Sequence, residues 1–240
     1  METIRIASFD PGKKNFAFYI EEFDEKELEC VHAPATKNER YCANGELTPV
    51  FKEIVNNVCR NGRTIMFKNT DLTLNCKTHS YLEDEYLHNL TDLLDSYISE
   101  WDKCSAIIIE KQMSFGKRHN TMALKIAQHC WSYFAFKYGR FKDIVEFPAY
   151  HKTQVLGACK LEKRTKTGKV SYKAVDKPTR KKWSIQQAIA ILNDRNDETT
   201  LSSLTTVRKK DDLADVLCQA QAYKILTYIP IICPSSTNTL

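Results

Sequence analysis

The chain has 240 residues, of which 42% are hydrophobic and 27% charged, with a net charge of +5. These values, together with 11 Tyr, 11 Phe and 3 Trp, are typical of a folded globular protein and argue against wholesale disorder. The sequence shows neither a basic, apolar leader nor an apolar run of ~20 residues, so we expect a soluble intracellular protein that does not contact a membrane. Nine cysteines, an odd number, are scattered without C-x₂₋₄-C spacing, which favours reduced thiols and predicts no zinc.

The first part of the chain predicts three strands that open a sheet. They cover residues 4–9, 16–23 and 28–32, and turns at Asp10-Pro11-Gly12 and Asp24-Glu25 join them. Residues 34–47 are polar and predict a loop. A short helix over 50–58 and a short strand or extended edge over 64–67 follow.

The middle and the end of the chain alternate helices with strands. Apolar residues at spacings of three and four predict an amphipathic helix over 83–101. The run Ala-Ile-Ile-Ile-Glu at 106–110 is typical of a strand buried on both faces, and we expect it beside the first strand. Residues 121–138 predict a second helix and 143–147 another strand. Two late helices over 183–193 and 207–229 are expected to pack on the sheet, and residues 231–240 to form a flexible tail.

Positive charge is concentrated in one segment. Residues 152–182 hold eleven Lys and Arg against Glu162 and Asp176, a local charge of +9 in an otherwise slightly acidic chain. Such a block can be a solvated loop. Its contrast with the rest of the chain favours contact with a polyanion, because neutralised phosphates release counterions. We expect a loop and a helix start that flank the active face.

Acidic residues stand where the predicted elements make charge unexpected. Asp10 ends the first strand, Glu110 ends the most apolar strand, and Asp212 and Asp215 share one face of the last helix. Each has an ordinary alternative: a turn residue at Asp10, an ion pair at Glu110, and a helix cap at Asp211 or Asp212. Together, four carboxylates suit a pair of Mg²⁺ ions that activates water at a phosphodiester.

Three motifs carry a resemblance to a known family. Residues 8–17 (SFDPGKKNFA), 107–112 (IIIEKQ) and 209–215 (KKDDLAD) resemble the motifs of RuvC-type Holliday junction resolvases, nearest to those of poxviruses and other large DNA viruses. The resemblance implies one RNase H-like nuclease domain over residues 1–230, with a mixed five-stranded sheet flanked by helices. Segments near 34–80 and 152–182 are longer than expected for a minimal member and are interpreted as insertions.

The resemblance also implies an activity and a site. Asp10, Glu110, Asp212 and Asp215 would bind two Mg²⁺, for which Mn²⁺ could substitute, with Asp10 bridging the ions and Asp211 an uncertain member. A homodimer would nick two strands of a four-way junction symmetrically, in the cytoplasm if the chain is virus-encoded, and would use no nucleotide cofactor. The residues expected to contact DNA are Lys13, Lys111, Phe115, Lys117, Arg118, Lys163, Arg164, Lys166, Arg180, Lys181, Lys182, Lys209 and Lys210.

Alternative functions remain open at this point. Phe115 could wedge into a junction or be an ordinary core or loop aromatic. A nuclease acting on flaps or RNA–DNA hybrids, or a branched-DNA-binding protein without catalysis, would share many of these features. ATPases of the actin and sugar-kinase type also begin with a phosphate turn, but they need further glycine-rich loops, and this chain has seven glycines with none after Gly168.

Overall fold

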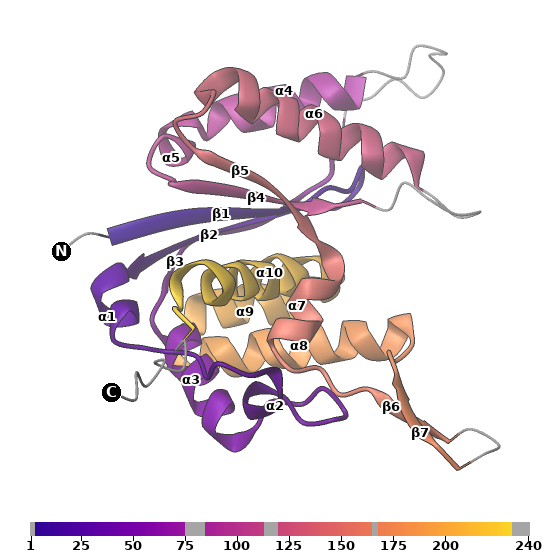
Figure 1. Ribbon diagram of the computed structural model, residues 1–240. Helices are drawn as coiled ribbons and strands as arrows, with labels where there is room; N and C mark the ends of the chain where they lie inside the picture. Colours follow the sequence, from indigo (N-terminus) through magenta and orange to yellow (C-terminus); the bar gives the residue numbers. More distant parts are fainter. Residues whose placement is uncertain (1–2, 75–84, 113–119, 165–167, 232–240) are drawn as a thin grey trace.

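The computed structural model describes residues 3–74, 85–112, 120–164 and 168–231, and its main feature is a sheet of strand order β3-β2-β1-β4-β5 (Figure 1). β1 (Thr3–Asp10), β2 (Phe16–Asp24) and β3 (Arg63–Thr70) pair antiparallel. β4 (Ala106–Lys111) pairs parallel with β1, and β5 (Asp143–Pro148) pairs parallel with β4. The predicted mixed five-stranded sheet is therefore confirmed, with β4 beside β1.

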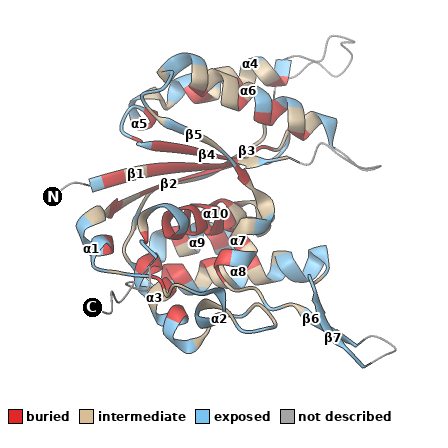
Figure 2. Ribbon diagram, viewed as in Figure 1, coloured by how far each residue is buried: buried red, intermediate tan, exposed pale blue. Residues whose placement is uncertain are grey.

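Helices cover both faces of this sheet (Figures 1 and 2). Side chains alternate along a strand, so Ile108 of β4 faces one core while Ile107 and Ile109 face the other. This double coverage explains why β4 is continuously apolar. One face carries α4 (Glu85–Ser96), α5 (Ile98–Trp101) and α6 (Thr121–Tyr138); the other carries α3 (Pro49–Arg60), α8 (Lys177–Asp194), α9 (Glu198–Thr206) and α10 (Lys210–Tyr228).

Aromatic rings fill the core beneath α4, α5 and α6. The ring centroid of Phe9 lies 5.4 Å from that of Trp101 and 5.3 Å from that of Phe134. The Trp101 indole N–H donates to the Leu94 carbonyl over 2.7 Å. The prediction of one continuous helix to Trp101 is wrong, because α4 ends at Ser96 and α5 begins at Ile98. After this break, the indole N–H of Trp101 reaches the Leu94 carbonyl, so both buried groups have a hydrogen-bond partner. Residues 83–84 lie outside the described part of the chain.

Local capping explains the other differences from the predicted elements. The strand expected over 28–32 does not form. The helix α1 (Glu25–Glu29) covers its first residues, because the Asp24 side chain accepts from the Lys26 N–H and turns the chain out of the sheet. The third antiparallel strand is β3. Within the expected loop at 34–47, a Thr36–Glu39 capping box begins α2 (Lys37–Arg40). Asp197 caps α9, which the sequence analysis did not predict.

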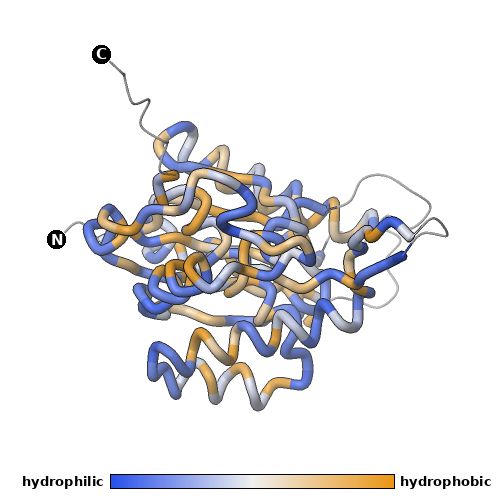
Figure 3. The backbone as a smooth tube through the Cα atoms, turned by 60° about the horizontal axis from the view of Figure 1, so that its bottom comes forward, coloured by the Kyte–Doolittle hydropathy of each residue, from blue (hydrophilic) through white to orange (hydrophobic). Residues whose placement is uncertain are grey.

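The basic block is more regular than the expected loop. It begins in α7 (Ala149–Val155), continues into a hairpin of β6 (Leu161–Arg164) and β7 (Val170–Lys173), and enters α8. The hairpin projects from the body of the molecule, and all residues of its two strands are exposed (Figures 1 and 2). Charge alone suggested a loop, whereas Val170 and Tyr172 are good strand formers. In Figure 3, hydrophobic segments run through the middle of the molecule and many peripheral turns are hydrophilic.

Two further expectations concern cysteines and membranes. The cysteines that the structure describes are all free thiols, and Cys59, Cys104, Cys130 and Cys218 are buried. Burial raises the pKa of Cys59 to about 11, so this thiol stays protonated near neutral pH. None of the described helices has the length and apolar character required to cross a bilayer. Of the tail expected at 231–240, residues 232–240 lie outside the described part of the chain.

A buried ionic network fixes β2 to the helices below it. Glu21 is fully buried and accepts from Arg195 over 2.9 Å, from the Tyr19 hydroxyl over 2.7 Å, and from Lys224 of α10. Burial by itself would raise the pKa of Glu21, but Arg195 and Lys224 lower it to about 2. The Lys224 ammonium also donates to the Asn61 carbonyl at the end of α3. One carboxylate thus joins β2, α10 and the end of α8.

Replacing this carboxylate should strongly destabilise the fold. Glu21→Gln keeps the side-chain shape but leaves two buried cations without their anion, so the free energy of unfolding should fall by ~3–5 kcal/mol in urea titrations. The contribution of Glu21 should be complete above its ordinary pKa of 4.5 and be lost as the pH falls toward 2. Glu162→Gln is the control, because Glu162 pairs with Arg164 on the exposed hairpin. Equal effects of the two substitutions would contradict this account.

Candidate active site

The ends of β1 and β4 place two carboxylates side by side. In the parallel register Phe9 lies opposite Ile109, so Asp10 and Glu110, the next residue of each strand, meet at the same edge of the sheet. The turn after Asp10 needs glycine, because a Cβ on Gly12 would lie 2.6 Å from the Asn15 carbonyl oxygen. The chain therefore leaves the sheet immediately after Asp10 and leaves this edge open.

A third carboxylate comes from α10, which crosses beneath these strands. Every residue of α10 from Leu213 to Ile225 is buried except Asp215. One turn further along, the buried Gln219 amide donates to the Ser8 hydroxyl and to the carbonyls of Phe9 and Ile108, over 3.0–3.2 Å. These bonds hold the helix against β1 and β4. Asp215 is thereby fixed at the strand ends.

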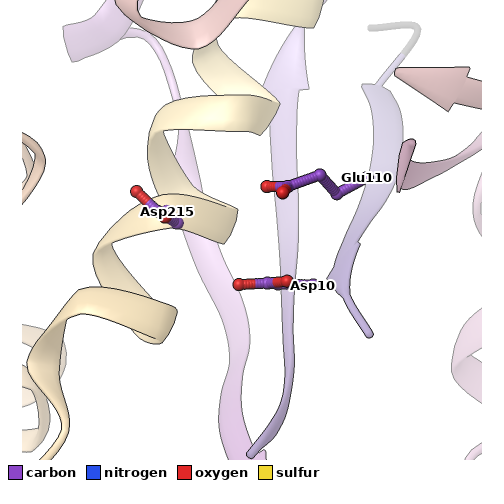
Figure 4. A group of neighbouring side chains, drawn as sticks. All are labelled: Asp10, Glu110 and Asp215. Carbon is purple, nitrogen blue, oxygen red and sulfur yellow. The ribbon is translucent and has the colours of Figure 1, made fainter. Parts of the chain in front are cut away.

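The three acids form one compact group (Figure 4). Carboxylate oxygens of Asp10, Glu110 and Asp215 all lie within 4.8 Å of one another, and each residue is half-buried. Burial raises the pKa of Asp10 well above its ordinary value, and Glu110 and Asp215 raise it further against the opposing effect of Lys152. The group thus brings together three acids and, in Lys152, one buried ammonium.

Lys152 of α7 is the buried cation of this group. Its ammonium lies 2.7 Å from Glu110 Oε2 and 3.0 Å from Asp215 Oδ2, and its side chain is 8% exposed. Burial alone would lower the pKa of Lys152, but Glu110, Asp215 and Asp10 raise it. In the sequence, Lys152 stood out only as the first charge of the basic block. The available signal was its position directly after β5, whose end lies at the same sheet edge as Glu110.

The remaining acids of the third motif lie outside this group. Asp212 is one turn before Asp215 and pairs with Lys209, whose ammonium lies 3.0 Å from it. Asp211 pairs with Lys181 at the start of α8. The structure therefore brings together three of the four predicted metal ligands. The other two acids of the motif, Asp211 and Asp212, each pair with a lysine instead.

A cleft of about 370 Å³ opens beside the acid group, and two of the three acids line it. Glu110, Lys152 and Asp215 lie in its wall, and its other cations are Lys111, Lys177, Arg180 and Lys181. Of the residues predicted to contact DNA, Lys111, Arg180 and Lys181 thus line the cleft directly. An acidic centre with a basic rim is suited to a phosphodiester, provided that a cation offsets the acids.

The other predicted DNA contacts are more scattered. Lys163 and Arg164 lie on the exposed hairpin, Lys182 is exposed on α8, and Lys209 and Lys210 begin α10. The Lys13 ammonium lies 4.8 Å from the centre of the Tyr86 ring. Phe115, Lys117, Arg118 and Lys166 lie outside the described residues.

Comparison with known proteins gives close viral relatives. No family model matches the chain. It is 37% identical over 237 residues to the uncharacterized protein 170L of Invertebrate iridescent virus 6, a match that covers 94% of this chain and 90% of that protein. It is 29% identical over 227 residues to the uncharacterized protein 97L of Invertebrate iridescent virus 3, covering 91% and 98%.

A solved structure gives the fold. The crystal structure of the fowlpox virus Holliday junction resolvase matches with a TM-score of 0.50 and 16% identity, covering 92% of this chain and 98% of the resolvase. At the level of the fold, this match confirms the resemblance that the three motifs predicted. The chain belongs to the same family as protein 170L of Invertebrate iridescent virus 6, and it has the fold of a viral Holliday junction resolvase.

Proposed function

We propose that the chain is a metal-dependent endonuclease that resolves four-way DNA junctions by paired, symmetric nicks. The observation that carries the proposal is the group of Asp10, Glu110 and Asp215, in which one carboxylate oxygen from each residue lies within 4.8 Å of the other two, beside a cleft rimmed by cations. Ionised carboxylates at this separation repel one another, and a bound cation relieves that repulsion. Asp10 stands at the position that the strand-end motif assigns to a metal ligand.

The donor set fits a hard divalent cation. Mg²⁺ prefers carboxylate oxygens, and here three converge from two strands and one helix. Burial and the neighbouring Glu110 raise the pKa of Asp10, and a bound cation would favour its ionised form. Asp10, Glu110 and Asp215 would hold the ion or ions, with Mn²⁺ able to substitute and Asp212 contributing from the rim. Bound metal would supply activation of water and stabilisation of the departing 3′ oxygen.

The residues of the chain have distinct tasks in this proposal. Lys152 holds the carboxylates of Glu110 and Asp215 in position, because its ammonium bonds both. Lys111, Arg180 and Lys181 orient the phosphodiester from the rim of the cleft. Gln219 maintains the distance between α10 and the strands, and therefore the shape of the acid group.

Four-way DNA junctions are the proposed substrate because the fowlpox protein of this fold is a Holliday junction resolvase. Resolution requires two nicks related by the symmetry of the junction, so we propose that two copies of the chain act as a homodimer. Its work would belong to the recombination or repair of viral DNA in the cytoplasm. Flaps and RNA–DNA hybrids are the alternative substrates.

Replacing Asp10 should separate binding from cleavage. Asp10→Asn removes a charge with little change of shape, so junction affinity in a gel-shift assay should persist while the cleavage rate falls by at least ~10²-fold. Glu110→Gln and Asp215→Asn should behave alike, and Asp212→Asn should have a milder effect. Wild-type cleavage should require Mg²⁺ or Mn²⁺ and stop with EDTA. Cleavage by Asp10→Asn at the wild-type rate, or activity in EDTA, would refute the metal site.

Replacing Lys152 should make stability depend on metal. Lys152→Met leaves the three acids without their buried cation, so the free energy of unfolding in EDTA should fall by ~3 kcal/mol. Added Mg²⁺ should restore more of the thermal stability in this variant than in wild type. Lys111→Met is the control, because Lys111 is 57% exposed and lies 3.8 Å from its partner Glu146. Identical metal responses of the two variants would contradict the central position of Lys152.

Charge removal on the basic block should change the salt dependence of binding. Lys163→Gln with Lys182→Gln removes one cation from the hairpin and one from α8. If both contact phosphates, the slope of log affinity against log salt should become shallower by ~2 for a junction, without a change in sequence preference. Lys137→Gln on α6 is the control, since this lysine is exposed on the opposite face of the sheet. An unchanged slope would make the block a solvated surface only.

A further inference from the structure

A second cavity lies next to the active-site cleft. It has a volume of about 530 Å³, and it shares Thr153 and Arg180 with the wall of the cleft. Thr153 directly follows Lys152, so the two spaces meet at α7. The walls come from residues 37–45, 150–160 and 174–180. The lining residues other than Tyr150, His151 and Leu226 belong to the two segments, near 34–80 and 152–182, that we interpreted as insertions.

The charged residues that line this cavity are all cations. Its wall contains Lys37, Arg40, Lys160 and Arg180, and none of the residues that line it is acidic. Within the described ranges, none of these four cations forms an ion pair. The neighbouring cleft differs, because Lys152 and Lys181 there are paired with acids. A concave surface whose charged residues are all cations attracts a polyanion.

An aromatic ring is presented to the same cavity. Tyr150 is 53% exposed and lines the wall, and its ring centroid lies 4.5 Å from that of His151. The His151 ring lies 5.4 Å from the buried ring of Phe147. The Tyr150 ring is therefore supported from the core while more than half of it faces solvent. Exposed aromatic rings beside cations are the features on which proteins stack unpaired bases.

Backbone bonds hold the walls together. The Lys160 N–H donates to the Asn44 carbonyl over 2.8 Å, and Tyr41 forms a β-bridge with Leu47. Gly157, at φ +75°, allows close approach to Leu47, because a Cβ there would lie 2.4 Å from that side chain. The cavity is thus formed before any ligand binds.

We propose that this cavity binds an unpaired nucleotide of the DNA strand that leaves the active-site cleft. The base would stack on Tyr150, and the flanking phosphates would contact Arg40, Lys160 and Arg180. A paired base offers no free face to such a ring, whereas a base at a branch point can leave its stack. The inference rests on the proposed nuclease for the identity of the strand. It adds a binding site for single-stranded DNA to that function.

Binding of short oligonucleotides tests this site without catalysis. In an Asp10→Asn background without metal, fluorescence anisotropy would measure the affinity of labelled hexathymidylate and of a 12-base-pair duplex. Tyr150→Ala should weaken hexathymidylate binding by at least ~5-fold, the lower range of base–aromatic stacking, with little effect on the duplex. Tyr150→Phe keeps the ring and should bind like the parent. Arg40→Gln should make the salt slope for the single strand shallower by ~0.7.

Matched controls and outcomes separate this proposal from the nuclease itself. Phe141→Ala removes an aromatic ring that is 97% exposed just before the opposite end of β5, and binding should not change. Thermal unfolding of Tyr150→Ala should stay near that of the parent. Unchanged hexathymidylate affinity in Tyr150→Ala, or an equal loss for the duplex, would overturn the site even if the wild type cuts junctions. Tyr150-dependent binding with no cleavage of any branched substrate would instead refute the nuclease and support the site.

Discussion

Three half-buried carboxylates with oxygens within 4.8 Å of one another repel, and this repulsion sets the condition that the rest of the site meets. Lys152 offsets part of the charge by bonding Glu110 and Asp215. The pKa of Asp10 nevertheless stays raised, first by burial and then by Glu110. A divalent cation would relieve what remains. The repulsion between the three carboxylates, which destabilises the group when no cation is bound, is therefore also what makes it suitable for binding a metal ion.

The fold sustains this arrangement by anchoring α10 with buried polar contacts. Gln219 bonds the backbone of β1 and β4 beside the acids, and Lys224 bonds Glu21 of β2 further along the helix. Two contacts on successive turns fix both the rotation and the position of the helix along its axis. Asp215 can then face the strand ends although its neighbours on α10 are buried. Stability and site geometry thus depend on the same helix.

Charge is arranged in zones around the acids. The acidic centre is bordered by lysines and arginines that line the cleft, and beyond them lies a cavity whose charged wall residues are all cations. The exposed hairpin of β6 and β7 extends the positive surface outward (Figure 1). In the proposed nuclease, this surface would attract phosphates over a distance set by salt screening, whereas hydrolysis would take place at the acids. Binding and cleavage can therefore be changed by different substitutions.

The sequence by itself determined the features that depend on neighbouring residues. The apolar run before Glu110 predicted a buried central strand, and the spacing of Leu213 and Leu217 predicted the last helix, so Asp10, Glu110 and Asp215 could be nominated. The cap at Asp24 replaced a predicted strand with the helix α1, and the break at Tyr97 divided one predicted helix into α4 and α5. In both places hydrogen bonds outweigh weak local propensities. Only the tertiary structure decided that Lys152 enters the acid group while Asp211 pairs with Lys181 of α8. Such choices depend on contacts between α7, α8 and α10, which periodicity along one segment does not encode.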